Sequence, residues 1–254
     1  MCIDMRSGSF SRYYNVSSEI HKLNPLCKIL AMLVFVVMVV MCSSLKVIIS
    51  LFLILSFLIT ISNISFKNYV KPIISMKLLF LFIVFINFVF GVSFNSSVVM
   101  INKVILVVMY SSVLLFTTTT NELAFGFASL LRPLGLFGVP VFKISMAIAL
   151  SFNFIPSLYI SSNKIIKSQM SRGFNYLDGS FKDRIVGIKS VFIPMFITSI
   201  KRADEISDAM VVKNFSFENE RSHIVSYKWR FNDAYMIISH LIIFVLVLVK
   251  EVVM

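Results

Sequence analysis

The sequence predicts an all-α, polytopic membrane protein with about five transmembrane helices and a pair of long amphipathic helices at the cytoplasmic surface. Of its 254 residues, 58% are hydrophobic and only 14% are charged, whereas a soluble domain usually carries about 25% charged residues. Several apolar segments are long enough to cross a bilayer. The net charge of +12 contains no block typical of nucleic-acid binding, and in a membrane protein it indicates cytoplasmic loops near anionic lipid.

The first half of the chain contains four expected spans. Residues 1–27 are polar, and Asn24-Pro25 predicts a turn with the proline in the first turn of a helix. The apolar run that follows is too long for one span, and Cys42-Ser43-Ser44 divides it into a hairpin. We expect a polar break at 63–72, a turn at 91–95, and spans at about 28–43, 45–62, 73–91 and 98–117.

After the fourth span the chain becomes more polar. The threonines at 117–120 and Asn121 offer side-chain oxygens to the start of a short helix, Glu122 to Leu131, which Arg132-Pro133-Leu134-Gly135 ends. A last span is expected at about 231–249, with Asn232 and Asp233 as capping residues. The chain therefore divides into residues 1–119 with four spans, a cytoplasmic region at 120–230 and a C-terminal transmembrane helix at 231–254.

Residues 139–160 are apolar enough to form a span, but we expect them at the inner surface of the membrane. The segment contains Lys143, Asn153 and Pro156, and its helix continues to Arg172, about 30 residues and more than a bilayer needs. Its apolar partner at 191–200 is too short to return across the membrane. We therefore predict two interfacial helices that prolines can bend.

The distribution of cations supports this topology. With the N-terminus inside, the outer loops and the C-terminus hold only Lys46, Lys103 and Lys250 of the 24 Lys and Arg residues, a strong positive-inside bias. A span at 139–160 would move five cations outside: Lys164, Lys167, Arg172, Lys182 and Arg184. The sequence predicts a multi-pass protein of the bacterial or archaeal cell membrane with a cytoplasmic N-terminus and an external C-terminus.

Two related segments lie within residues 154–215. Each begins with Phe-Ile-Pro, continues for several helical turns, and ends in a cation followed by a residue that accepts a left-handed conformation. The two ends are Ser171-Arg172-Gly173 and Val212-Lys213-Asn214. Such a cation can project from the helix end into another protein. The alternative interpretation is an ordinary surface helix whose C-terminal cation the helix dipole favours.

Apolar stripes predict that these two helices pack together. The stripe on the first helix is Ile155, Leu158, Ser162, Ile165 and Gln169, and that on the second is Phe196, Ile200, Ala203, Ser207 and Met210. Small side chains on both stripes favour a close crossing. We expect Ser162 and Ala203 in the packed face, Pro156 and Pro194 as hinges, and the two terminal cations at nearby or opposed ends.

The sequence offers little for catalysis or for cofactor binding. The histidines are isolated, with His21 and His223 expected in solvent and His240 expected to be packed and hydrogen-bonded. The cysteines lack CxxC spacing, so neither a metal site nor a disulfide framework is expected. A P-loop is absent, and the spans lack the carboxylates that proton-coupled transport needs. We expect no catalytic residue, and the two cationic ends become the best functional candidates.

Four stretches, in this order and spacing, resemble the transmembrane (T) component of energy-coupling factor (ECF) transporters. This EcfT/CbiQ family comprises vitamin and metal uptake proteins related to ABC importers. Residues 21–28, His-Lys-Leu-Asn-Pro-Leu-Cys-Lys, resemble its opening motif, and 131–141 resemble its link into the coupling helices. Phe154-Ile155-Pro156, followed by residues 169–173, resembles its first Ala-Arg-Gly motif, and residues 202–215 resemble the stretch that leads into the second.

The resemblance implies an L-shaped coupling subunit without catalytic activity of its own. In the family, the two Ala-Arg-Gly tips dock in grooves of two cytoplasmic ATPases, and the membrane part holds a substrate-binding S component. The first tip of this chain departs from the motif only by Ser for Ala, and the second departs at all three positions. Lys keeps the charge but not the bidentate fork of Arg. The resemblance assigns ATPase coupling to Ser171, Arg172, Gly173, Val212, Lys213 and Asn214.

Two other functions stay open from the sequence alone. A self-contained permease would need a polar pathway through the spans. A lipid-processing membrane enzyme would need an acid or base near the interface, where the nearby carboxylates are Asp178, Asp183 and Asp204. Transport or turnover by this chain alone would favour these alternatives over a coupling subunit for vitamin or metal-ion uptake.

Overall fold

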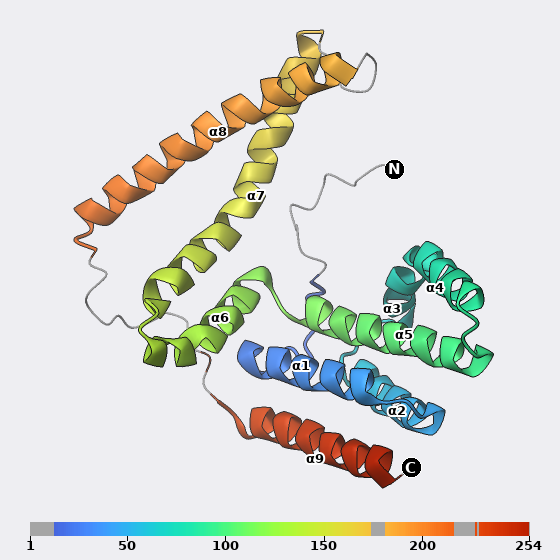
Figure 1. The fold of residues 1–254 in the computed structure, drawn as a ribbon. Helices are drawn as coiled ribbons and strands as arrows, with labels where there is room; N and C mark the ends of the chain where they lie inside the picture. Colours follow the sequence, from blue (N-terminus) through green and yellow to red (C-terminus); the bar gives the residue numbers. More distant parts are fainter. Residues whose placement is uncertain (1–12, 174–180, 216–226, 228, 254) are drawn as a thin grey trace. The chain divides into compact units, whose positions relative to one another are not determined.

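The computed structural model describes residues 13–173, 181–215, 227 and 229–253, and the regular elements in these ranges are all helical (Figure 1). The chain divides into two compact units. Among the described residues, the bundle unit is formed by residues 13–133, 227 and 229–253, and the hairpin unit by residues 134–173 and 181–215. The bundle unit contains α1 (Pro25–Met41), α2 (Leu45–Ile61), α3 (Phe66–Ser75), α4 (Lys77–Val89), α5 (Phe94–Thr117), α6 (Thr120–Leu131) and α9 (Phe231–Val253). The hairpin unit contains α7 (Val141–Ser171) and α8 (Phe181–Val212), and the 3-10 helix η1 (Arg132–Phe137) connects α6 to it.

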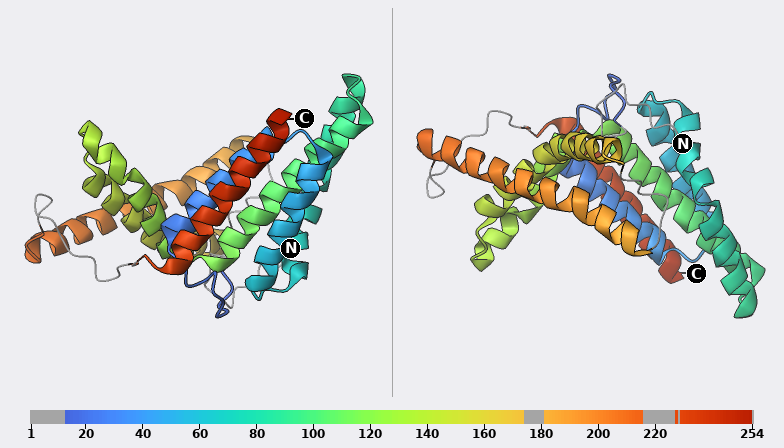
Figure 2. Two further views of the ribbon diagram at one scale, coloured as in Figure 1. Left: turned by 90° about the horizontal axis from the view of Figure 1, so that it is seen from below. Right: turned by 90° about the horizontal axis from the view of Figure 1, so that it is seen from above.

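Helices α1 and α5 form the centre of the bundle unit. Helix α1 packs against α5, α6 and α9, while α5 also packs against α2, α3 and α4; Figure 2 shows α9, α1 and α5 side by side. The rings of Phe35 in α1 and Tyr110 in α5 stack with their centroids 4.4 Å apart. Leu51 of α2 and Leu106 of α5 are fully buried in the same core. Burial of these large apolar side chains holds the helices together.

The outward faces of the bundle unit are also apolar. Leu53 of α2 is 69% exposed, Phe88 of α4 is 83% exposed and Leu246 of α9 is 63% exposed. Such a surface is suited to lipid or to an apolar partner, and not to water.

Several helices are long and apolar enough to cross a membrane. These are α5, α7 and residues 231–250 of α9, while α3 and α4 meet at a bend of 53° and could together form a broken span. Helices α1 and α2 are apolar but shorter, with 17 residues each. The predicted class, an all-α polytopic membrane protein, is confirmed. The position of α7 at the inner surface stays a prediction, because α7 itself has the length and hydropathy of a span.

Local sequence signals correctly predicted a helix that starts with Pro25 in its first turn and a threonine cap for the short helix α6, which begins two residues earlier than expected. Asn24 caps α1, where its Oδ1 accepts the Leu26 N–H at 3.0 Å, and Pro25 is the first helical residue. Thr119 caps α6, and Glu122 completes a capping box. As predicted, α7 runs through Pro156 without a break and contains 31 residues.

Two segments differ from expectation. The expected polar break at 63–72 is wrong, because α3 occupies most of it. Tyr69 is fully buried there and its hydroxyl lies 2.8 Å from Ser62 Oγ, so one face of α3 joins the core while its lysines stay exposed. Helix α8 also begins ten residues earlier than its apolar core at 191–200 and reaches 32 residues.

Candidate functional site

Both helices of the hairpin unit end in the same backbone geometry. After α7, the Gly173 φ angle is +84° and its N–H donates to the Met170 carbonyl at 3.0 Å. After α8, the Asn214 φ angle is +52°, and its N–H donates to the Val211 carbonyl at 2.9 Å. A further bond of 2.9 Å, from the Phe215 N–H to the Met210 carbonyl, completes a Schellman motif at the end of α8. The predicted left-handed residues therefore lie directly after the two cations.

The residues at the two ends are exposed. Arg172 and Lys213 lie at the surface, together with Ser171, Gly173, Val212 and Asn214. Neither cation forms an ion pair with another residue that the structure describes. Val212 is 85% exposed beside Lys213, so the second end presents an apolar side chain next to its charge. Each end is therefore able to offer a positive charge to a carboxylate of another protein.

The two cations lie at opposite ends of the helix pair. Figure 1 shows α7 and α8 meeting near the C-terminal end of α7 and diverging from there. Arg172 follows α7, while Lys213 follows the last residue of α8. The 32 residues of α8 span about 48 Å at 1.5 Å per residue, so the sites offered by the two ends are far apart.

The packed face of α8 differs from the expected stripe. The Arg202 guanidinium donates to Ser157 Oγ of α7, so Arg202 lies on the side of α8 that reaches α7. Other partly buried positions follow at helical spacing: Ser190, Pro194, Ser199 and Ile206. In the expected stripe, Phe196 and Ile200 are 58% and 47% exposed, Ala203 and Ser207 are exposed as well, and only Met210 is partly buried. The long Arg202 side chain, and not a small residue, thus bridges the helices at this level.

The other residues expected in the helix pair lie on the same two helices. Pro156 precedes Ser157 in α7, and Pro194 is partly buried in α8. Ser162 is partly buried, and its Oγ donates to the Tyr159 carbonyl at 2.8 Å within α7. The hinge role of the prolines and the packing role of Ser162 stay predictions.

A second polar cluster, at the start of α1, was not predicted as a site. Asp233 of α9 is fully buried. Its Oδ1 accepts the Asn24 N–H and its Oδ2 accepts the Arg230 N–H, both at 2.7 Å. The Asn24 amide group donates in turn to the Tyr227 carbonyl at 3.0 Å. Asn24 and Asp233 thus join the N-terminal ends of α1 and α9.

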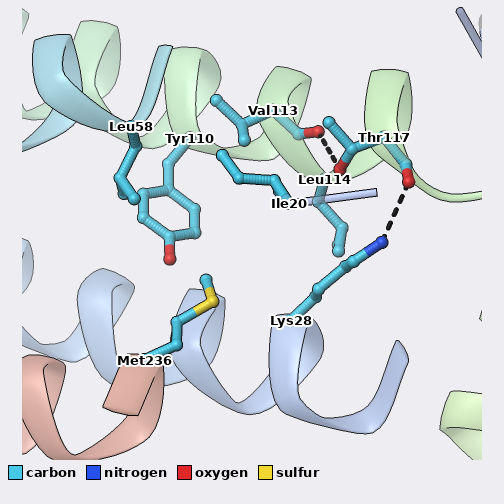
Figure 3. Close-up of a pocket in the computed structure, with 8 residues that line it drawn as sticks. All are labelled: Ile20, Lys28, Leu58, Tyr110, Val113, Leu114, Thr117 and Met236. Carbon is cyan, nitrogen blue, oxygen red and sulfur yellow. Dashed lines mark hydrogen bonds between the residues drawn. The ribbon is translucent and has the colours of Figure 1, made fainter. Parts of the chain in front are cut away.

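Lys28, one turn further along α1, connects this region to the end of α5. It is 2% exposed, and its Nζ donates to the Thr117 carbonyl at 2.9 Å and to the His21 carbonyl at 3.3 Å. A cavity of about 10 Å³ lies beside it, lined partly by Tyr110 and Met236 (Figure 3). This space suffices for about one water molecule. Lys28 therefore connects the C-terminal end of α5 to the start of α1.

His21 is partly buried and hydrogen-bonded, so the expectation that it is solvated is wrong. Its Nε2 lies 3.0 Å from the Tyr14 carbonyl and its Nδ1 lies 2.6 Å from Ser18 Oγ. A carbonyl only accepts, so Nε2 carries the proton and the Ser18 hydroxyl donates to Nδ1. Burial lowers the pKa of His21, an effect that the Lys28 charge supports and that hydrogen bonds and Glu122 oppose.

A pH dependence follows from the lowered pKa of His21. Because the unfolded imidazole has a pKa of about 6.5, its contribution to stability is complete above that pH and is lost as the pH falls through the lower folded value. We expect His21→Gln to flatten the fall in the thermal unfolding midpoint between neutral and mildly acidic pH. Thermal unfolding in detergent at several pH values measures this, and identical pH profiles for the two proteins would contradict it.

Among the described residues, the remaining titratable side chains form no group suited to binding a metal ion. No group of three or more His, Cys, Asp or Glu residues within the described ranges could hold a metal ion. As predicted, His240 is packed and hydrogen-bonded: it is 3% exposed and its Nε2 lies 2.9 Å from the Tyr110 hydroxyl. Asp204 is exposed on α8. Asp178 and His223 lie outside the described residues, as does the side chain of Asp183.

Comparisons with known proteins agree with one another. A family model described as "Cobalt transport protein", CbiQ, matches residues 16–224. The chain is 25% identical over 251 residues to the energy-coupling factor transporter transmembrane protein EcfT of Listeria innocua, covering 92% of this chain and 95% of that protein. It is 29% identical over 244 residues to EcfT of Streptococcus thermophilus, covering 90% of this chain and 92% of that protein. It is 30% identical over 223 residues to EcfT of Acidaminococcus fermentans, covering 80% of this chain and 81% of that protein.

Proposed function

Because the chain belongs to the CbiQ family of transporter membrane proteins, we propose that it is the coupling subunit of an ABC-type ECF importer. It transmits ATP-driven motion of two cytoplasmic ATPases to a substrate-binding membrane S component for vitamin or metal-ion uptake. ATP hydrolysis belongs to the partners, and this chain carries no catalytic residue. Residues 120–230 and the N-terminus lie in the cytoplasm, and the C-terminus lies outside.

One observation carries this proposal: α7 and α8 each place an exposed cation directly before a left-handed residue. A cation held at the C-terminus of a rigid helix has few ways to fold back onto its own chain. Arg172 is therefore available to form a bidentate pair with a carboxylate in a groove of an ATPase. At the second end the sequence departs from the family motif, but the backbone turn at Asn214 has the same hand as that at Gly173. Lys213 is thus presented in the same way, as a point charge.

The length of the two helices suits a lever. Helix α7 has 31 residues and α8 has 32, and neither is interrupted by its internal proline. The Arg202–Ser157 hydrogen bond connects them between their ends. Displacement of either cationic end by a closing ATPase dimer would therefore move both helices together.

The apolar outer faces of the bundle unit supply the other half of the coupling. The exposed apolar side chains of α2, α4 and α9 include Leu53, Phe88 and Leu246. An S component, itself a membrane protein, can pack on such a surface without desolvating polar groups. Apolar contacts lack the directional hydrogen bonds that would lock the partner in one orientation, so it can tilt between its outward and inward states.

Reconstitution into liposomes tests the proposal. The chain is incorporated alone, with the two ABC-type ATPases of the same cell, and with the ATPases and an S component, and uptake of radiolabelled Co²⁺ and vitamins is measured with and without ATP. We expect ATP-dependent uptake only in the complete assembly. Uptake by the chain alone would instead indicate a self-contained permease, and hydrolysis of the liposome lipid by the chain alone would indicate a lipid-processing enzyme.

A further inference from the structure

We propose that Asn24 and Asp233, with Tyr227, Phe125 and Gly126, form an anchor that transfers motion of the α7–α8 pair to the transmembrane helices. This inference rests on the proposed coupling function. The chain leaves the bundle unit for the hairpin helices after α6, and the described residues that lead back into it are Tyr227, Trp229 and Arg230. The outgoing and the returning segments both attach to one place in the bundle unit, the first turn of α1.

The outgoing segment is attached through α6. Gly126 of α6 is buried against the start of α1. A Cβ atom added at Gly126 would lie 2.5 Å from Ile29 Cδ1 and 3.3 Å from the Pro25 carbonyl carbon. The backbones of α6 and α1 are therefore in close contact, and a shift of α6 must also displace α1.

The returning segment is attached by hydrogen bonds. The buried Asp233 carboxylate accepts the Asn24 and Arg230 N–H groups at 2.7 Å each, and the Asn24 side chain donates to the Tyr227 carbonyl at 3.0 Å. The Cys27 thiol adds a bond of 3.2 Å to the Asp233 carbonyl. Short, charge-assisted bonds to backbone N–H groups fix the register of α9 against α1 more strictly than apolar packing does.

The two attached segments also touch each other. The ring of Phe125 in α6 lies with its centroid 4.7 Å from that of Tyr227 in the returning segment. Because α1 packs against α5, α6 and α9, a displacement that arrives through either segment enters the bundle unit at its central helix. Without this anchor, the ATPases could move the hairpin helices without moving the transmembrane helices.

The replacement Asp233→Asn tests the anchor in the complete assembly of this chain with its two ATPases and an S component. An asparagine keeps the shape, but its amide nitrogen cannot accept the N–H bond that the second carboxylate oxygen accepts. We expect the variant to bind the ATPases, and the assembly that contains it to hydrolyse ATP at the wild-type rate. We also expect the amount of Co²⁺ or vitamin imported per phosphate released to fall about tenfold or more.

The matched control is Asp208→Asn, the same chemical change at an exposed position of α8, which should leave the import-to-phosphate ratio unchanged. If Asp233→Asn does not reach the membrane, the test uses Tyr227→Leu instead. This variant removes the contact with the Phe125 ring and keeps the hydrogen bond from Asn24 to the backbone carbonyl of residue 227. We expect its ratio to fall as well. A wild-type ratio in Asp233→Asn, or in Tyr227→Leu when that variant decides, would overturn the anchor alone. Failure of the wild-type chain to bind ATPases would refute the coupling function and the anchor with it.

Discussion

Replacement of Arg172 by alanine is expected to weaken association with the ATPases by about 100-fold or more, with the spans still inserted. Arg172 is exposed directly after the last residue of α7, and Gly173 fixes its position through a left-handed turn. Removing one partner of a hydrogen-bonded charge pair at an interface costs about 2–5 kcal/mol. The loss should appear as failure to co-purify with the ATPases and as loss of ATP-dependent uptake.

Two further variants separate the charge from its geometry. Arg172→Lys keeps the charge without the planar fork, so we expect an intermediate affinity. Lys167→Ala removes another exposed cation of α7, about one turn before the end, and should have little effect. Normal co-purification and uptake in Arg172→Ala would contradict the docking role, whereas an equal loss in Lys167→Ala would indicate nonspecific attraction by the basic helix.

The parts of this fold that could be predicted from the sequence depend on interactions between near neighbours. Asn24, Thr119, Gly173 and Asn214 all end or begin helices through bonds to backbone groups within five residues. The threonines at 117–120 therefore marked the start of α6. The tolerance of Gly173 and Asn214 for a positive φ angle marked the C-terminal ends of α7 and α8.

The features that could not be predicted depend on residues far apart in the chain. Asp233 and Asn24 are separated by 209 positions, and the sequence indicated only a turn at Asn24 and a capping role for Asp233. Tyr69 makes α3 a helix of the core because its ring lies against Phe116, with centroids 5.2 Å apart. On α8, two faces carry apolar residues, and only tertiary structure shows that the face with Arg202 reaches α7.

Replacement of Lys28 by alanine is expected to lower the free energy of unfolding of the bundle unit by about 3 kcal/mol. The Lys28 side chain is buried, and its Nζ donates to the Thr117 and His21 carbonyls and, at 3.5 Å, to Thr118 Oγ1. Without it, the Thr117 carbonyl at the C-terminal end of α5 loses its donor, and that helix end loses a favourable positive charge. Thermal unfolding in detergent should show a lower midpoint.

A matched lysine and a second variant at the same position distinguish the hydrogen bonds from general effects of charge and volume. Lys22 lies six positions earlier and forms an exposed ion pair with Glu19 at 2.9 Å, so Lys22→Ala should change the free energy of unfolding by less than about 1 kcal/mol. Lys28→Met keeps most of the volume but donates no bond. If Lys28→Met restored the wild-type midpoint, the side chain would stabilise the bundle unit by filling space. If it stayed near the alanine variant, the three acceptors around Nζ would be what holds the end of α5 to the start of α1.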